Sequence, residues 1–196
     1  IKHDTYGISI NIKKFKDHVK YLTDTFKIAT LNDFNEELSV SLSIDDGYKD
    51  TIDAIDILTE YKVPFSLFIT SSNIDKKGYL SKYDIANISK NEYSNIGTHG
   101  VNHIKLGKIN KTNQYIELKN CKDVLEDIIA NEIISLSYPH GSYNIDTLNI
   151  VQNLGYQWAA CSTKGFNGIK TNRYLLNRSE IISTDTSIDL LKKIEG

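Results

Sequence analysis

Two short segments of the chain combine residue types that can hold a metal ion and activate water. The segment SLSIDDGYKD (41–50) places Asp45 and Asp46 side by side at the end of an apolar run, just before a glycine. The segment THGVNH (98–103) holds His99 and His103, four residues apart. On a helical turn, positions i and i+4 face the same way, so both imidazoles can reach one metal ion. Two histidines and one carboxylate make a three-ligand site that leaves a position open for water.

The aspartate pair has a chemical explanation in such a site. Bound zinc lowers the pKa of a coordinated water from about 16 towards about 7. Neighbouring residues at a strand end point in different directions, so one carboxylate can bind the metal while the other acts as a general base. The alternative interpretations are that the aspartates cap a helix beginning near Lys49, and that the histidines lie on a helix surface. A cap accounts for one aspartate but not for two.

The elements that must position these residues alternate between strand and helix patterns. Strands are predicted at LSVSLSI, 63–70, SNIGTH, 132–139 and 156–163. Helices are predicted at DTIDAIDILTEYK, 81–90, 113–132 and IDTLNIVQNLG. The clearest amphipathic helix, 113–132, has Ile116, Cys121, Leu125 and Ile128 on one side.

This alternation predicts parallel strands joined by crossover helices. In such folds, sites gather at the C-terminal ends of the strands. Asp45 and Asp46, His99, and the segment Pro139–His140–Gly141 each follow a different predicted strand. The sequence therefore predicts that they converge on one pocket.

The composition indicates one domain over residues 1–196. The net charge is −2 with acids and bases interspersed, so no nucleic-acid partner is predicted. No apolar run reaches the length of a membrane span. Cys121 and Cys161 are too few for a disulfide framework and are predicted to be buried free thiols. His3 and His18 are predicted to be surface residues.

Three motifs in this order resemble a known family, the polysaccharide deacetylases of carbohydrate esterase family four. SIDDGY (43–48) resembles the family's first motif, T-F-D-D-G, and THGVNH resembles its second, H-[ST]-x-x-H. SYPHGSYN (137–144) resembles the third, around a proline and a glycine that shape the substrate groove. GYQWAACSTKGFN (155–167) and LLNRSEI (175–181) resemble segments near the family's C-terminal end.

The resemblance implies a distorted (β/α) barrel with about seven strand–helix units, in which residues 1–36 lead into the barrel. The implied reaction is hydrolysis of an acetamide on a sugar, which releases acetate. Asp45 then corresponds to the general base, and the backbone N–H of His140 to the oxyanion contact. The implied metal ligands are Asp46, His99 and His103. The implied substrate-groove residues are Tyr138, Pro139, Gly141 and Tyr143, with a buried core position as the alternative for the two tyrosines.

The chain also departs from the family pattern at three places. Gly100 replaces the Ser or Thr of the second motif, so a hydrogen bond behind the metal ligands is predicted to be missing. Ser137 stands where many members have the arginine that orients the base. Leu176–Asn177–Arg178 stands where members have the histidine that serves as general acid, and the Asp-rich fourth motif is absent. The donor of a proton to the leaving amine is therefore unassigned; His140 is a candidate, and a groove-lining or surface histidine is the other interpretation.

The predicted function is metal-dependent removal of N-acetyl groups from an amino-sugar-containing polysaccharide. An O-acetyl esterase or deformylase on the same scaffold, and a non-catalytic carbohydrate-binding domain with a metal, are the alternatives. Zinc is the first expectation for the metal, and Co, Ni, Mn and Fe also suit these ligands. The resemblance favours a location outside the cytoplasm or at the membrane. The chain begins with Ile1 rather than Met. This is compatible with a trimmed start, from which a signal, an anchor or further modules are missing.

Overall fold

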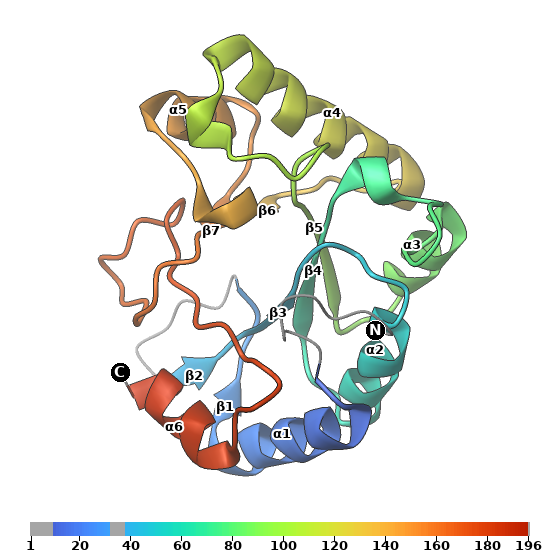
Figure 1. Ribbon diagram of the computed structural model, residues 1–196, viewed down its shortest axis with the longest axis vertical. Coiled ribbons are helices and arrows are strands. Elements are labelled where there is room, and N and C mark those ends of the chain that lie inside the picture. Colours follow the sequence, from blue (N-terminus) through green and yellow to red (C-terminus); the bar gives the residue numbers. More distant parts are fainter. Residues whose placement is uncertain (1–9, 32–37, 196) are drawn as a thin grey trace.

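A curled, five-stranded parallel sheet forms the centre of the molecule (Figure 1). The computed structural model describes residues 10–31 and 38–195. The strand order is β3-β4-β5-β6-β7, and every neighbouring pair is parallel. The strands are β3 (Leu42–Ile44), β4 (Phe65–Ile69), β5 (Ser94–Thr98), β6 (Ser135–Ser137) and β7 (Trp158–Ala160). A second sheet pairs β1 (Lys27–Ile28) with β2 (Ser39–Val40), also in parallel.

Helices surround the outside of this curled sheet (Figure 1). They are α1 (Ile12–Thr25), α2 (Thr51–Glu60), α3 (Lys82–Ile88), α4 (Lys111–Ile129), α5 (Ile145–Asn153) and α6 (Ser187–Glu195). Single 3-10 turns are η1 (Ser71–Asn73), η2 (Leu106–Lys108) and η3 (Pro139–Gly141). The predicted fold class, an α/β fold built as a distorted (β/α) barrel, is confirmed: the described residues form a curled, five-stranded parallel sheet with helices outside it. No described helix is long and apolar enough to cross a membrane.

Local sequence signals fix where the crossover helices begin. Ser81 and Asp84 form a capping box at the start of α3, since each side chain accepts the other residue's backbone N–H. Asn110 and Asn144 cap α4 and α5 through their side-chain oxygens. These caps satisfy N–H groups that a helix start leaves unpaired, so they define where α3, α4 and α5 begin.

The central strands are buried on both faces, as parallel strands between helices must be. All five residues of β4 are buried, and Leu67 and Phe68 have no exposed surface. Gly97 in β5 packs against Phe68, and a Cβ at this position would lie 2.5 Å from the Phe68 ring. Glycine therefore allows the close approach of these neighbouring strands.

The buried face of α4 differs from the predicted one. Ile116 is 45% exposed, whereas the residues that face the core are Gln114, Glu117, Leu118, Cys121, Lys122 and Leu125. The prediction for Ile116 was wrong because Gln114 and Glu117 find hydrogen-bond partners inside and occupy the core side. Cys121 and Cys161 are buried free thiols, as predicted.

The chain after β7 closes the sheet at its far edge and then returns to α1 (Figure 1). Leu176 bridges in parallel to Ala160, and its carbonyl accepts the N–H of Cys161 at 2.8 Å. Further on, the Asp185 carbonyl lies 3.1 Å from the Nε2 atom of His18. His18 is only 4% exposed, so its predicted surface position was wrong: the C-terminal segment covers it. His3 and parts of the 1–36 lead-in lie outside the described residues.

Candidate metal centre and active site

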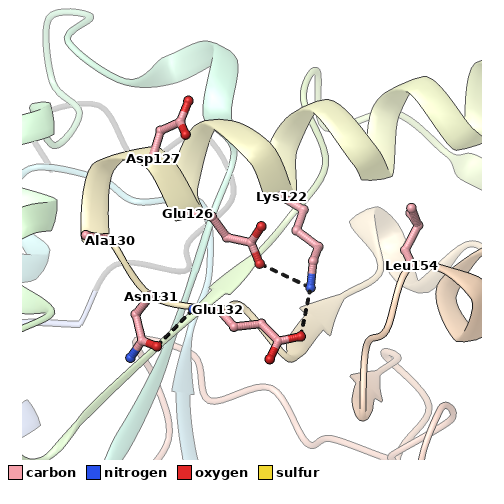
Figure 2. Close-up of a pocket in the computed structure, with 7 residues that line it drawn as sticks. All are labelled: Lys122, Glu126, Asp127, Ala130, Asn131, Glu132 and Leu154. Carbon is pink, nitrogen blue, oxygen red and sulfur yellow. Dashed lines mark hydrogen bonds and ion pairs between the residues drawn. The ribbon is translucent and has the colours of Figure 1, made fainter.

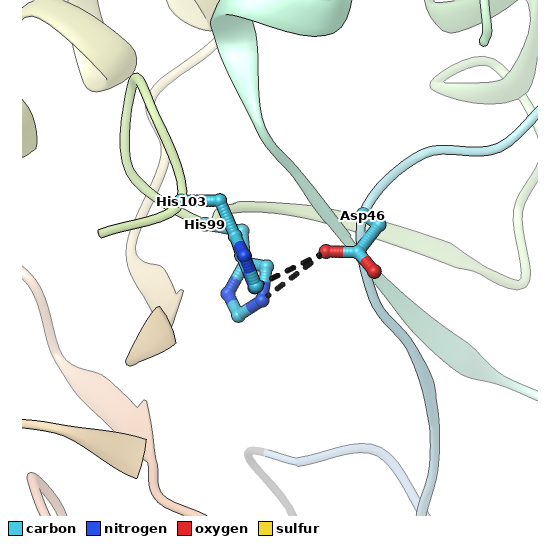
Figure 3. A group of neighbouring side chains, drawn as sticks. All are labelled: Asp46, His99 and His103. Atoms are coloured by element: carbon cyan, nitrogen blue, oxygen red, sulfur yellow. Dashed lines mark ion pairs between the residues drawn. The ribbon is translucent and has the colours of Figure 1, made fainter. Parts of the chain in front are cut away.

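The three predicted ligands come together at the C-terminal ends of β3 and β5. The Oδ1 atom of Asp46 lies 3.5 Å from Nε2 of His99 and 3.4 Å from Nε2 of His103. Figure 3 shows both imidazole rings directed at the same carboxylate oxygen. One ligand atom from each residue lies within 4.8 Å of the others, which is close enough for all three to bind one ion.

The two distances from the Asp46 oxygen to the imidazole nitrogens fit a metal site better than a hydrogen-bonded cluster. At 3.4 Å and 3.5 Å the histidine–carboxylate contacts are longer than charge-assisted hydrogen bonds, which are about 2.7–2.9 Å. Ligands at about 2.0–2.1 Å from a tetrahedral zinc ion lie roughly 3.3–3.4 Å from each other. The nitrogen and oxygen donors are also those that zinc prefers. The three residues therefore fit the group that the family resemblance implies.

A tight turn after β3 separates the two aspartates. Asp46 and Gly47 both have left-handed backbone conformations, with φ of 73° and 76°. The Gly47 N–H donates to the Asp45 carbonyl at 3.0 Å, which closes the turn. This turn directs Asp46 at the histidines, whereas Asp45 forms different contacts. Neither aspartate is the N-cap of α2, since that position is occupied by Asp50.

The two histidines do not lie on a helical turn, so this part of the prediction was wrong. The chain from His99 to His103 is a loop, in which Gly100 has φ of 72° and His103 has φ of 53°. The loop brings the two rings together, with centroids 4.8 Å apart. The i, i+4 spacing indicated the correct pair of residues although the conformation is not helical.

The ring of His99 is fixed by a hydrogen bond on its far side. Its Nδ1 lies 2.7 Å from the Ser137 carbonyl, and only a protonated nitrogen can donate there. In the neutral ring the lone pair is then on Nε2, the nitrogen that faces Asp46. This is the arrangement by which a carbonyl behind a ligand sets the histidine tautomer. His99 is 3% exposed, so its ring has little freedom to move.

His103 is held less firmly and is one-third exposed. Burial lowers the pKa of His103, and the nearby rings of His99 and His140 lower it further, while Asp46 and Asp45 oppose this. A lowered pKa favours the neutral imidazole, which is the form that binds a metal.

Asp45 forms a two-pronged ion pair with Arg178, a residue to which the sequence analysis gave no role. The Arg178 Nη1 and Nη2 atoms donate to Oδ1 and Oδ2 of Asp45, both at 2.8 Å. Arg178 also donates to Ser137 Oγ at 2.7 Å and to Ser43 Oγ at 3.0 Å. Ser137 in turn donates to Asp45 Oδ2 at 3.1 Å. Many family members have an arginine where this chain has Ser137. Here the guanidinium that contacts Asp45 belongs to Arg178, in the C-terminal segment.

The signal for Arg178 was present in the sequence. The segment LLNRSEI contains a cation next to buried apolar residues, and a buried arginine requires a carboxylate or several acceptors. What the sequence could not provide was the partner, 133 residues earlier in the chain.

This ion pair determines the protonation state of Asp45. Burial raises the pKa of Asp45, but the charges of Arg178 and His99 and the hydrogen bonds from Arg178 and Ser137 outweigh it and lower the pKa to about 2. Asp45 is therefore a carboxylate at neutral pH. Its Oδ2 lies 3.7 Å from Nε2 of His99, so it stands beside the three ligands without joining them.

The third motif forms the tight turn η3 beside the histidines. His140 has φ of 56°, and the centroid of its ring lies 4.4 Å from the ring centroid of His103. Its Nε2 lies 3.2 Å from the His103 carbonyl and so acts as a donor there. Among the described residues, no acceptor is bonded to the His140 backbone N–H.

The predicted groove residues are placed differently from one another. Tyr138 has no exposed surface and donates its hydroxyl to the Tyr174 carbonyl at 3.0 Å, so its side chain belongs to the core. Pro139 is also buried. Tyr143 is 37% exposed and packs on Tyr138 with ring centroids 5.4 Å apart, and Gly141 is partly exposed. Tyr143 and Gly141 are thus the members of this group that are open to solvent.

A surface depression at the end of α4 contains none of the predicted site residues (Figure 2). Lys122 lies there 3.2 Å from a Glu126 oxygen and 3.9 Å from a Glu132 oxygen. These charged groups pair with each other, and Lys122 also bonds to the Ile133 carbonyl. The depression lies where the chain passes from α4 towards β6, and most of the residues that line it are charged or polar.

A curled parallel sheet with an Asp–His–His cluster at its C-terminal edge is the arrangement that the family resemblance implies. The family described as polysaccharide deacetylase matches residues 33–159, and the chain belongs to this family. Bacillus subtilis YxkH, named as a polysaccharide deacetylase, is 27% identical over 180 residues. That match covers 86% of this chain and 64% of YxkH, so the chain spans less than two-thirds of that relative's length.

Solved structures share the fold. The Streptococcus pyogenes deacetylase PplD, solved in complex with acetate, has a TM-score of 0.86 at 22% identity. The match covers 95% of this chain and 88% of PplD. BC0361, a polysaccharide deacetylase from Bacillus cereus, has a TM-score of 0.85 at 23% identity, over 98% of this chain and 66% of BC0361.

Proposed function

We propose that this chain is a metal-dependent deacetylase that removes N-acetyl groups from an amino-sugar-containing polysaccharide. The observation that carries the proposal is the convergence of Asp46, His99 and His103, with a separate ionised Asp45 beside them. A purely structural metal site needs no spare carboxylate. Family membership supports the reaction class. The acetate in the PplD complex is the product that deacetylation would release.

Each residue would have a separate task in this reaction. Asp46, His99 and His103 would hold a divalent cation, with zinc as the first candidate and Co, Ni, Mn or Fe as others. The cation would supply Lewis acidity, which makes water more acidic and polarises a carbonyl. Asp45 would take a proton from the attacking water as general base. The His140 N–H would donate to the developing oxyanion.

The substrate side of the site would use the third-motif turn. Tyr143 offers a partly exposed aromatic face, which suits a sugar ring, and Gly141 in the same turn is partly exposed as well. Breaking the C–N bond leaves acetate and an amine that must acquire a proton. His140 is placed next to His103 and is the candidate donor among the described histidines.

The test is acetate release from N-acetylglucosamine oligomers. Protein stripped with a chelator is expected to be inactive and to recover when zinc is restored. Asp45→Asn is expected to bind zinc normally but to lose about 10²–10⁴-fold in activity, which is the usual contribution of a general base. Full activity in Asp45→Asn would overturn the assigned base. Zinc binding without acetate release from any oligomer would overturn the substrate class.

A second candidate reaction is hydrolysis of an O-acetyl ester or a formamide at the same site. The observation that favours an ester is the sequence Leu176–Asn177–Arg178, which replaces the histidine that family members use as general acid. An alcohol leaves from a tetrahedral intermediate with less need for protonation than an amine does. Formate and acetate assays on formamide, O-acetyl and N-acetyl substrates would separate these reactions.

A further inference from the structure

A buried carboxylate on α4 lies directly behind the loop that joins the two histidines. Glu117 is 5% exposed, although carboxylates are rarely buried without a partner. No lysine, arginine or histidine of the described residues forms an ion pair with it. Its partners are donors from the loop: Oε2 accepts the N–H groups of Val101 and Asn102, both at 2.9 Å, and Oε1 accepts Asn102 Nδ2 at 2.6 Å.

The loop needs this support because its backbone conformation is unfavourable. His103 has a left-handed backbone, with φ of 53°, which is costly for a residue with a Cβ. Consecutive N–H groups that point into one concavity form a site for a negative charge, and Glu117 occupies it. Three hydrogen bonds to an ionised acceptor are strong enough to hold such a turn.

Gly100 makes the close approach of loop and carboxylate possible. A Cβ at this position would lie 3.4 Å from Glu117 Oε2 and 3.3 Å from Pro139 Cγ, at a φ of 72°. The Ser or Thr of the family motif would be strained here. The hydrogen bonding expected to be lost with that Ser or Thr is provided to the loop by Glu117.

The two histidines differ in how they are held. The His99 ring is anchored by its own bond to the Ser137 carbonyl. Among the described residues, no hydrogen bond reaches the Nδ1 of His103, and this side chain is one-third exposed. The position of His103 therefore depends on its backbone, and Glu117 bonds to the two residues immediately before it.

We infer that Glu117 is a positioning residue that preorganises His103 for the metal ion. The inference rests on the proposed metal site. A carboxylate is required because both of its oxygens accept. A glutamine has one accepting oxygen, and its NH₂ group would face the donors of the loop. A ligand that is not held in place must be ordered when the metal binds, which weakens the binding.

The test compares Glu117→Gln with Glu126→Gln. Glu126 lies on the same helix and also accepts a loop N–H, that of Ile133 at 2.8 Å, but at the far end of α4. Zinc affinity, measured by chelator competition, is expected to fall about 10–100-fold in Glu117→Gln and to stay unchanged in Glu126→Gln. In the metal-free protein, amide exchange at Val101 and Asn102 is expected to accelerate in Glu117→Gln alone.

The outcomes distinguish the inference from the function on which it rests. Wild-type protein that fails to bind zinc would overturn the proposed metal site. Wild-type binding with equal zinc affinity in Glu117→Gln, or an equal loss in both variants, would overturn the role of Glu117. If Glu117→Gln does not fold, Asn102→Ala removes one of the three bonds without altering α4 and is expected to weaken zinc binding to a smaller extent. Unchanged affinity in Asn102→Ala would then count against the inference.

Discussion

At the scale of single residues, the main feature of the site is the pairing of Asp45 with Arg178. The guanidinium is bidentate to the carboxylate and also bonds to two serines, which fixes the direction of both oxygens. Strong pairing keeps Asp45 ionised, but it also makes the carboxylate a weaker base. Arg178 thus fixes the orientation and the negative charge of Asp45, and it lowers the affinity of Asp45 for a proton.

Replacing Arg178 with methionine is expected to destabilise the metal-free protein at neutral pH by roughly 1–3 kcal/mol, because the partly buried Asp45 loses its partner. The pKa of Asp45 is about 2 in the folded chain, below its ordinary value of 3.8. The stabilisation is therefore fully present above pH 3.8 and is lost as the pH falls from there towards about 2. Urea unfolding near neutral pH and again at about pH 3 measures this difference.

The control is Arg173→Met in the same segment, where the exposed guanidinium stacks on Trp158 instead of pairing in the site. Its effect is expected to be independent of pH across this range. The difference in unfolding free energy between wild type and Arg178→Met should shrink at low pH. If it stayed constant down to about pH 3, Asp45 would not depend on Arg178 for its charge.

At the scale of elements, the site is built where three parallel strands end. β3 leads into the two aspartates, β5 into His99, and β6 into the third-motif turn. Because adjacent parallel strands end at the same edge, residues from distant parts of the sequence meet there. The spacing between β4 and β5 depends on Gly97, two residues before His99.

Gly97→Ala is expected to destabilise the protein by about 1–3 kcal/mol through overpacking. The added Cβ would lie 2.5 Å from the Phe68 ring and 2.6 Å from Ser135 Oγ, and Phe68 has no exposed surface into which it could move. Urea unfolding measures the loss. Gly168→Ala is the matched control, since no heavy atom lies within 4 Å of its Cβ position. Equal stability of the two variants would contradict the tight contact between β4 and β5.

At the scale of the whole molecule, the C-terminal segment joins the last strand to the first helix. It brings Arg178 into the site, and its residues Ser183 and Asp185 then contact α1. Asp185 fixes the position of this segment. Its carboxylate accepts the Ile182 N–H at 2.7 Å and pairs with Lys193 at 2.5 Å, and the residue is only 6% exposed. The Lys14 side chain also reaches the Ser183 carbonyl at 2.6 Å.

Asp185→Asn is therefore expected to lower the free energy of unfolding by roughly 1–3 kcal/mol, because a buried charged hydrogen-bond network loses its acceptor. Zinc affinity of the folded protein is expected to stay unchanged, since Asp185 contacts none of the proposed ligands. Thermal unfolding and chelator competition provide the two measurements. Asp24→Asn, which breaks only an exposed pair with Lys20, is expected to change stability by less than about 1 kcal/mol. A comparable loss of unfolding free energy in both variants would argue against a special role of Asp185 in fixing the C-terminal segment.

The sequence by itself determined the type of fold and the chemical groups of the site. Apolar runs alternating with helical patterns predicted parallel strands, and the ends of these runs predicted where the strands end. The proposed ligands could be selected because carboxylates and imidazoles at strand ends are unusual residues in recognisable motifs. These are local properties, and a single segment is enough to reveal them.

Tertiary structure alone decided which groups hold these residues in place. Arg178 reaches Asp45 across 133 residues of sequence, and Glu117 reaches the histidine loop from the next helix. The same is true of Tyr138, whose aromatic ring points into the core rather than into a groove. Such contacts depend on how far the sheet curls and on which face of each helix turns inward. Periodicity predicts an inward face for apolar residues, but it gives no partner for a buried charge such as Glu117 or Arg178.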